Sequence, residues 1–311
     1  MMKSLNLLIP AAIVAGAVAL ALYAMPRTYQ IYMPQKAVAE TYSATSGDAI
    51  PTGRIAGRIV WEGALPEAPP VKGMIGGAVH GPLWGTVPNP AAPSIHPTNR
   101  GIANAVVHLK SVGPNAKRWT YLPLSVEMRE SKIGLIQGDI PTQLGFVRLG
   151  DDVNFVPRDA WYQMVRVRGA DFFTSPLWNP LALPALALAG GIATPALPPP
   201  NADRIVKRKF DHSGHIAISS GTGYFWNGAD AFVCEHPYYS LTDAEGRFEL
   251  TNVPPGEYEI VAWLKNWNIL SKDRDPETGK IMRLNFNKPF TTTGRVNVIE
   301  GQTANVELSL P

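Results

Sequence analysis

The chain has 311 residues, of which 45% are hydrophobic and only 17% are charged, and its formal net charge at pH 7 is +3. That charge is too small to indicate a nucleic-acid-binding surface, and the single cysteine excludes an intramolecular disulfide and any metal site built from several cysteines. The 28 glycines and 29 prolines argue against a helical protein, because proline breaks helix interiors and glycine weakens them. The composition therefore favours short strands joined by turns and irregular loops.

An uncharged apolar segment runs from Leu5 to Met25 and is long enough to cross the roughly 30 Å hydrocarbon core of a bilayer as a helix. A cleaved signal peptide is the alternative, but its apolar core is typically shorter, about 7–15 residues. We therefore expect a retained anchor, with the β-rich body on the periplasmic or extracytoplasmic side. The side chains expected in the membrane are Leu7, Leu8, Ile13, Val14, Val18, Leu20, Leu22 and Tyr23.

The body of the chain begins after a tether. Residues 26–50 have no clear periodicity, whereas residues 53–61 alternate apolar and polar side chains as a half-buried strand does. Residues 62–100 are rich in proline and glycine, so we expect a long loop there. Further strands are predicted at 105–109, 125–129, 146–149, 152–155 and 163–168.

A second uncharged segment extends from Phe172 to Ala202. Its prolines disfavour both a membrane-spanning helix and a central strand. One interpretation is a loop that covers the protein's own core; the other is an apolar loop that rests on the bilayer or on a partner subunit, because large exposed apolar patches mark interaction sites. In the second interpretation the contact residues are Trp178, Leu181, Leu183, Leu186 and Leu188.

The last third of the chain carries the clearest strand and turn signals. Residues 238–250 predict a hairpin with a tight turn at Asp243 to Gly246, and a second turn follows at residues 252–256. Another hairpin is predicted around residues 276–279. Strand patterns at 258–263, 296–299 and 306–310 complete a meander, which is typical of an antiparallel β-sandwich.

The stretch Thr242-Asp-Ala-Glu-Gly-Arg-Phe-Glu-Leu-Thr-Asn-Val-Pro-Pro-Gly-Glu-Tyr258 resembles the core motif of carboxypeptidase regulatory-like domains. The resemblance covers residues 236–311. It implies a transthyretin-like β-sandwich, which in that family is usually accessory and non-catalytic.

The middle of the chain is similar to cupredoxin-like proteins in which such a motif follows a plastocyanin-type domain. Residues 147–155 and Asp159 match the first part of that pattern, and His236-Pro-Tyr238 matches the lead into the hairpin. Where the family has its first copper ligand, in a His-Asn pair, this chain has Ala160-Trp-Tyr162. The resemblance therefore implies a cupredoxin-like sandwich that departs from its family at the copper site.

The remaining copper positions depart in the same way. A blue-copper centre needs two histidines, a cysteine thiolate and a weak axial methionine. In the matching stretch, residues 210–215, His212 replaces the cysteine and only His215 stands in place, while Ile218 lies near the expected methionine. We therefore expect no cofactor.

Two weaker metal candidates stay open. His212-x-x-His215 could hold zinc or copper, or both side chains hydrogen-bond the backbone near a loop. Cys234 and His236 could form a displaced ligand pair, or Cys234 is a small buried apolar residue.

No arrangement of residues predicts catalysis. The neighbouring carboxylates lie in exposed strands or turns rather than in a pocket that would separate their pKa values. No serine lies in a nucleophile elbow, and no phosphate-binding glycine loop follows a strand. The chain is therefore predicted not to be an enzyme, and no small-molecule substrate is expected.

The predicted fold is mainly β, with antiparallel β-sandwiches (cupredoxin-like plus transthyretin- or immunoglobulin-like) and one N-terminal transmembrane helix. The predicted division is an anchor at 1–25, a tether at 26–50, a cupredoxin-like sandwich at 51–232 with long loops at 62–100 and 172–202, and a carboxypeptidase regulatory-like sandwich at 233–311.

The predicted function is that of a membrane-anchored periplasmic accessory subunit, which docks on a membrane protein complex and stabilises it. Its partners would be the other subunits and the lipid bilayer, without nucleic acid. By analogy with cupredoxins, the complex would be a photosynthetic or respiratory electron-transfer assembly. Two alternatives remain: a copper-binding electron carrier, or a carbohydrate-binding or adhesion module that uses exposed Trp226, Trp263 and Trp267.

Overall fold

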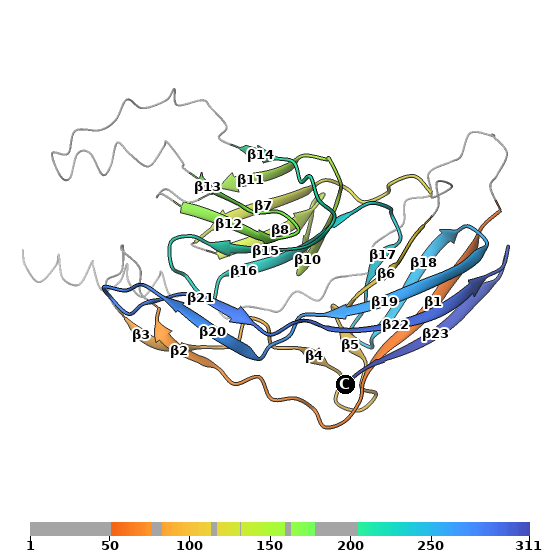
Figure 1. The fold of residues 1–311 in the computed structure, drawn as a ribbon, viewed down its shortest axis with the longest axis horizontal. Helices are drawn as coiled ribbons and strands as arrows, with labels where there is room; N and C mark the ends of the chain where they lie inside the picture. Colours follow the sequence, from red (N-terminus) through yellow and green to blue (C-terminus); the bar gives the residue numbers. More distant parts are fainter. Residues whose placement is uncertain (1–50, 76–82, 113–116, 131, 159–162, 178–204) are drawn as a thin grey trace, which may run out of the picture. The chain divides into compact units, whose positions relative to one another are not determined.

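The structure, a computed structural model, describes residues 51–75, 83–112, 117–130, 132–158, 163–177 and 205–311. Strands, turns and loops make up this part of the chain (Figure 1), so the predicted all-β class is confirmed for it. Within the same ranges there is no helix of the length and apolarity that a membrane crossing requires. The predicted anchor, the tether and the contact residues Trp178 to Leu188 lie outside the described residues.

The first sandwich combines strands from both ends of the described chain. One of its sheets has the order β18 (Arg247–Val253), β1 (Gly53–Trp61), β23 (Thr303–Leu310). The other has the order β17 (Tyr239–Leu241), β6 (Val106–Leu109), β19 (Gly256–Leu264), β22 (Phe290–Val298). Apolar residues at alternate positions of both sheets, such as Ile55, Ile260 and Leu308, share one core.

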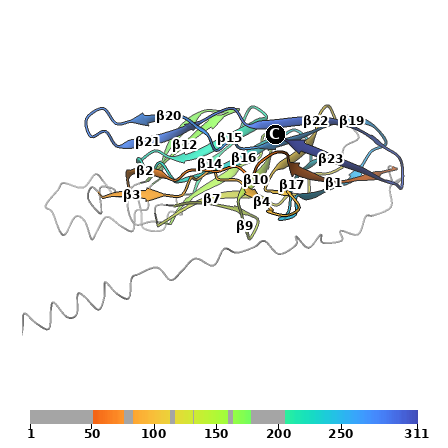
Figure 2. The same ribbon diagram turned by 90° about the horizontal axis from the view of Figure 1, so that it is seen from below.

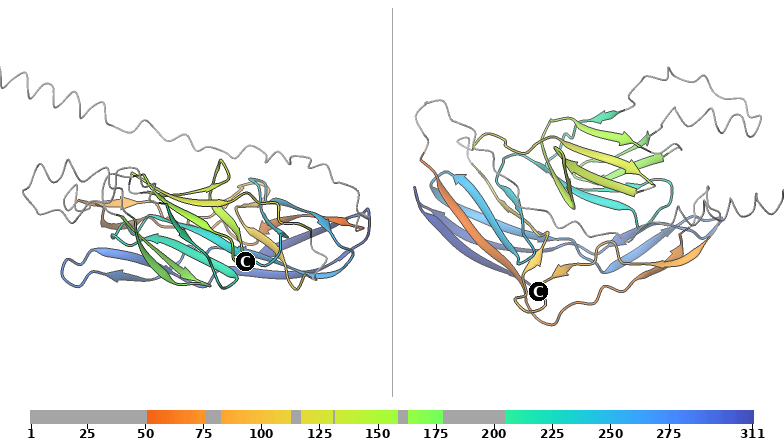
Figure 3. Two further views of the ribbon diagram at one scale, coloured as in Figure 1. Left: turned by 90° about the horizontal axis from the view of Figure 1, so that it is seen from above. Right: turned by 180° about the vertical axis from the view of Figure 1, so that it is seen from behind.

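The second sandwich, with the yellow to teal strands of Figure 3, also has two sheets. The first has the order β10 (Leu144–Arg148), β16 (Gly228–Cys234), β15 (Gly214–Ser220), β12 (Gln163–Gly169), β13 (Phe173–Leu177). The second has the order β14 (Val206–Arg208), β11 (Val153–Pro157), β7 (Leu124–Arg129), β8 (Lys132–Gln137), β9 (Ile140–Thr142). Phe155, Phe210 and Ile216 belong to the core between these sheets.

The second sandwich is inserted into the first, since β7 to β16 fall between β6 and β17 in the sequence. The chain passes from β6 of the first sandwich to β7 of the second, and it returns from β16 to β17. The sheets therefore combine strands from both sides of the predicted domain boundary between residues 232 and 233. Strand β1 is the central strand of its sheet, where its backbone pairs with both β18 and β23. The C-terminal strands therefore need the N-terminal one to complete their hydrogen bonding.

The predicted loop at 62–100 contains strands as well. Strand β2 (Val71–Met74) pairs with β3 (Trp84–Val87), and β4 (Ser94–Ile95) pairs with β5 (Ile102–Ala103). A third two-stranded ribbon, β20 (Ile269–Arg274) with β21 (Ile281–Phe286), confirms the hairpin predicted around residues 276–279 (Figure 2). The β2–β3 and β20–β21 ribbons contribute to a small apolar cluster of Val71, Phe225, Ile281 and Leu284, which explains why such short ribbons form.

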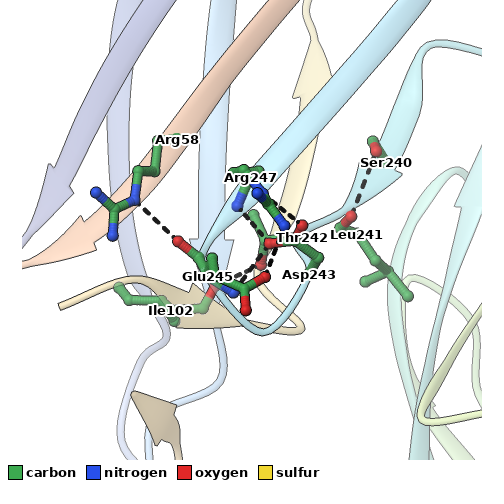
Figure 4. Close-up of polar contacts among 8 residues, drawn as sticks. All are labelled: Arg58, Ile102, Ser240, Leu241, Thr242, Asp243, Glu245 and Arg247. Carbon is green, nitrogen blue, oxygen red and sulfur yellow. Dashed lines mark hydrogen bonds and ion pairs between the residues drawn. The ribbon is translucent and has the colours of Figure 1, made fainter. Parts of the chain in front are cut away.

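The predicted turn between β17 and β18 is held by its own polar residues (Figure 4). The Asp243 carboxylate accepts hydrogen bonds from the backbone N–H groups of Glu245, at 3.0 Å, and of Arg247, at 2.8 Å. The guanidinium of Arg247 pairs with the same carboxylate at 2.8 Å. From β1, Arg58 Nε donates to the carbonyl oxygen of Glu245 at 2.8 Å, so the turn is fastened to the neighbouring strand.

The preceding residue, Thr242, connects this turn to the segment around β5. Its hydroxyl donates to the carbonyl oxygen of Ile102 at 2.6 Å and accepts from the N–H of Ala105 at 2.8 Å. Thr242 is buried, so both bonds satisfy backbone groups that water does not reach. Thr242 and Asp243, the first residues of the motif that resembles carboxypeptidase regulatory-like domains, therefore stabilise the turn and its contact with β5.

Candidate functional site

The two sandwiches meet at an apolar cluster that we call the junction. Its buried members are Val106, Leu144, Phe146, Phe232, Cys234, Tyr239 and Trp263. They come from β10 and β16 of the second sandwich and from β6, β17 and β19 of the first. In β16, Ala231 and Val233 enter the core of the second sandwich, whereas Phe232 and Cys234 belong to the junction. The first sandwich thus covers the face of β16 that would otherwise be exposed.

One ion-pair network lies beside the apolar residues of the junction. Asp230 of β16 accepts from Lys265 Nζ at 2.7 Å and contacts His215 Nε2 of β15 at 2.8 Å. The Asp230 side chain is only 13% exposed, and burial by itself would raise the pKa of its carboxyl. The Lys265 ammonium and His215 outweigh burial and lower this pKa to about 2. The carboxylate is therefore ionised at neutral pH and joins the two sandwiches.

Aromatic rings fix the partners of Asp230. The His215 ring lies 4.8 Å from the Trp263 ring and 5.4 Å from the Phe232 ring, measured between centroids. Lys265 Nζ lies 5.2 Å from the centre of the Phe286 ring, a cation–π arrangement. These contacts limit the rotamers of both side chains, so the ion pairs form at a small cost in side-chain entropy.

A pair of histidines, His108 and His236, packs against Tyr239 of the junction. His108 Nδ1 and His236 Nε2 both face the carbonyl oxygen of Leu109, at 3.1 Å and 3.0 Å. The His108 ring stacks on the Tyr239 ring at 4.8 Å with an interplanar angle of 9°, and the His236 ring lies 5.1 Å from the same ring. Burial is the main reason that the pKa of each histidine lies below its usual value. Both imidazoles are consequently neutral at pH 7.

The sequence-based metal candidates have separate partners. His212 Nδ1 contacts Asp171 at 2.8 Å and its side chain is 73% exposed, whereas His215 contacts Asp230. These two histidines therefore bind carboxylates, and not the backbone as one interpretation proposed. Cys234 donates its thiol hydrogen to the carbonyl oxygen of Phe232 at 3.3 Å. In the described parts of the chain, no three or more His, Cys, Asp or Glu side chains group as metal ligands.

Cys234 is fully buried, and burial raises the pKa of its thiol. Since only the thiolate is a strong nucleophile, we expect the folded protein to react with Ellman's reagent at pH 8 at least about 100-fold more slowly than the urea-unfolded protein. Absorbance of the released thionitrobenzoate measures both rates. Comparable rates would contradict the burial of Cys234 in the junction.

Two of the three tryptophans considered for a carbohydrate platform are part of the interior, and the third, Trp226, is half-buried against the cluster of Val71 and Phe225. Trp263 is 8% exposed and Trp267 is 4% exposed. The Trp267 ring lies 5.3 Å from the Trp61 ring within the core of the first sandwich. This corrects the expectation of exposed aromatic residues, because neither indole can offer a face to a sugar.

The sequence analysis did not select Asp230, Lys265 or His108. A single carboxylate inside the apolar run of residues 229–234 was the available signal, because a charge in a buried strand requires a partner. The identity of that partner could not be read from the sequence. No family model, no curated protein and no solved structure matches this chain.

Proposed function

We propose that this protein is a non-catalytic accessory subunit, anchored in the membrane by residues 5–25, that docks on a membrane protein complex outside the cytoplasm and stabilises it. The observation that carries this proposal is the junction. Ionic and aromatic contacts there bind two sandwiches to each other, and a stiff two-sandwich body loses little conformational entropy when it docks on a partner.

The candidate copper ligands already interact with other groups of the protein, which supports a binding role over electron transfer by copper. A metal at His215 would have to displace Asp230, which is itself paired with Lys265. A metal at His236 would have to displace the Leu109 carbonyl oxygen or the Tyr238 N–H, which lies 3.3 Å from Nδ1. The thiol of Cys234 is buried and protonated, whereas copper needs a thiolate. Each ligand therefore has a competing internal partner or the wrong protonation state.

The nature of the partner follows from the sequence. A membrane-spanning segment would keep the body in the plane of the bilayer, where the neighbours are lipids and other membrane proteins. The uncharged segment at 172–202 supplies contact residues for such a neighbour, with Trp178, Leu181, Leu183, Leu186 and Leu188 proposed as its side chains. The cupredoxin resemblance favours an electron-transfer assembly, photosynthetic or respiratory, as the host complex.

Extraction of the tagged full chain in a mild detergent tests this proposal. We expect the chain to migrate on a native gel with an integral membrane assembly at a constant ratio. Replacing Leu181 and Leu183 with aspartate should release it, whereas Leu270→Asp is the matched control because Leu270 is 70% exposed on the β20–β21 ribbon. A chain that migrates alone, or that carries stoichiometric copper with an intense visible band, would overturn the proposal.

A further inference from the structure

Three hydrogen bonds involve the two connections between the sandwiches and the ends of β6 and β17 beside them. His236, between β16 and β17, donates from Nε2 to the carbonyl oxygen of Leu109, the last residue of β6, at 3.0 Å. The N–H of Lys117 donates to the Tyr238 hydroxyl at 2.9 Å. The Tyr121 hydroxyl donates to the carbonyl oxygen of Tyr239. The first of these bonds contains the only one of these side chains that titrates near neutral pH.

The protonation state of His236 follows from its two partners. A carbonyl oxygen only accepts, so Nε2, which faces Leu109, carries a hydrogen. The Tyr238 N–H points at Nδ1 from 3.3 Å, so Nδ1 offers a lone pair. A second proton on Nδ1 would place two donors against each other and break this bond. The local backbone at residues 236–238 is therefore compatible only with the neutral ring.

His108 is subject to the same restriction. Its Nδ1 donates to the Leu109 oxygen that His236 also uses, and its ring stacks on Tyr239. A proton on either histidine places a positive charge next to the other imidazole, in a site that is largely closed to water. Two charged rings could not share one acceptor without strong repulsion.

The surrounding charged groups do not offset the cost of a positive charge on either histidine. Lys110 lowers the pKa of His108 further, and its ammonium is paired with Glu259 at 2.5 Å. Glu235 raises the pKa of His236, but burial has the larger effect. The Asp230 carboxylate is already paired with Lys265 and His215.

The remaining groups around the histidines, apart from Lys117, are uncharged at neutral pH. Burial raises the pKa values of Tyr121, Tyr239 and Cys234, and the Tyr238 hydroxyl and the Lys117 N–H hydrogen-bond to each other. Of these residues only Lys117 carries a charge, and a cation gives no compensation to an imidazolium.

We propose that the His108–His236 pair is a proton-operated latch, which fixes the connection between β16 and β17 to the end of β6 when both rings are neutral and favours separation of the two sandwiches when either ring takes up a proton. The opened junction exposes both rings to water and allows their ordinary protonation. As the pH falls through about 6.5, the opened state binds more protons than the closed one and becomes more favourable. This inference does not depend on which complex the body docks with.

The lone cysteine provides the readout, because Cys234 lies in the junction and becomes reachable only when the sandwiches separate. The full chain in detergent micelles would be treated with 4,4′-dithiodipyridine, which reacts with thiols at acid and neutral pH. The rate would be divided by that of the urea-unfolded chain at each pH. We expect protection of the thiol to fall about 30-fold between pH 6.5 and pH 5.5, because both rings take up a proton in the opened state over this range.

The double variant His108→Gln with His236→Gln separates the latch from general acid effects. Glutamine offers a donor and an acceptor and does not titrate, so protection in this variant should be independent of pH. The single variant His108→Gln, which keeps both bonds of His236, should retain a fall in protection. His212→Gln is the control, since that exposed ring on Asp171 has a raised pKa and lies outside the junction.

Three results would overturn the latch. The first is wild-type protection that stays constant from pH 7.5 to pH 5.5. The second is a fall in protection that persists in the double variant. The third is loss of the far-ultraviolet circular dichroism of the strands over the same pH range, because that would indicate unfolding of the sandwiches instead of their separation.

Discussion

Replacing Asp230 with asparagine is expected to lower the free energy of unfolding by about 2–4 kcal/mol. The substitution removes the negative charge that Lys265 Nζ and His215 Nε2 contact at 2.7 Å and 2.8 Å. Both partners are mostly buried, with 29% of each side chain exposed, so water replaces the lost interaction only in part. Urea unfolding followed by circular dichroism measures the change.

A surface ion pair supplies the control for Asp230. Arg54 and Glu249 are 2.7 Å apart, but their side chains are 56% and 46% exposed. Glu249→Gln should therefore cost less than about 1 kcal/mol. Adding Lys265→Met to Asp230→Asn should restore part of the lost stability, because it removes the unpaired ammonium. Equal effects of Asp230→Asn and Glu249→Gln would contradict a buried network at the junction.

Replacing Gly246 with alanine is expected to cost at least about 3–5 kcal/mol or to prevent folding. Gly246 has a φ of +81°, and an added Cβ would lie 2.4 Å from the carbonyl oxygen of Ile59 and 2.7 Å from Cα of Gly101. Neither backbone atom can move freely, since the N–H of Ile59 donates to the carbonyl oxygen of Gly246 and the N–H of His96 donates to that of Gly101, each at 2.8 Å. Thermal unfolding or yield of soluble protein measures the effect.

Gly279 is a matched control for Gly246. Its φ is +66°, and no atom lies within 4 Å of the position of an added Cβ. Gly279→Ala therefore carries only the conformational penalty of a left-handed residue, about 1–2 kcal/mol. Equal losses of stability in the two variants would contradict the close approach of the hairpin turn to β1.

Local alternation was sufficient to predict several strands of both sandwiches. The pattern at 53–61 coincides with β1, and that at 163–168 is one residue shorter than β12. In these strands one face is buried and the other is partly exposed, so the period of two is visible in the sequence. Strand β16 was missed because the junction buries its second face as well, which removes the alternation.

The stretch at 210–215 was interpreted from a family pattern instead of from its own alternation. Its last two residues begin strand β15, in which Ile216 and Ile218 enter the core. The ribbon of β2 and β3 was hidden because glycine and proline dominate residues 62–100. Short two-stranded ribbons depend on tertiary packing, here on Phe225 and Ile281, more than on local propensity.

The sequence by itself determined that the chain is rich in β-strands, where its sharpest turns lie, and that its one cysteine has no partner for a disulfide. Only the tertiary structure decided that β1 completes a sheet of C-terminal strands, that Asp230 meets Lys265, and that His108 and His236 share the carbonyl oxygen of Leu109. Alternation and turn chemistry report the surroundings of each residue along the chain. The insertion of one sandwich into the other brings distant residues together, and that proximity leaves no local trace in the sequence.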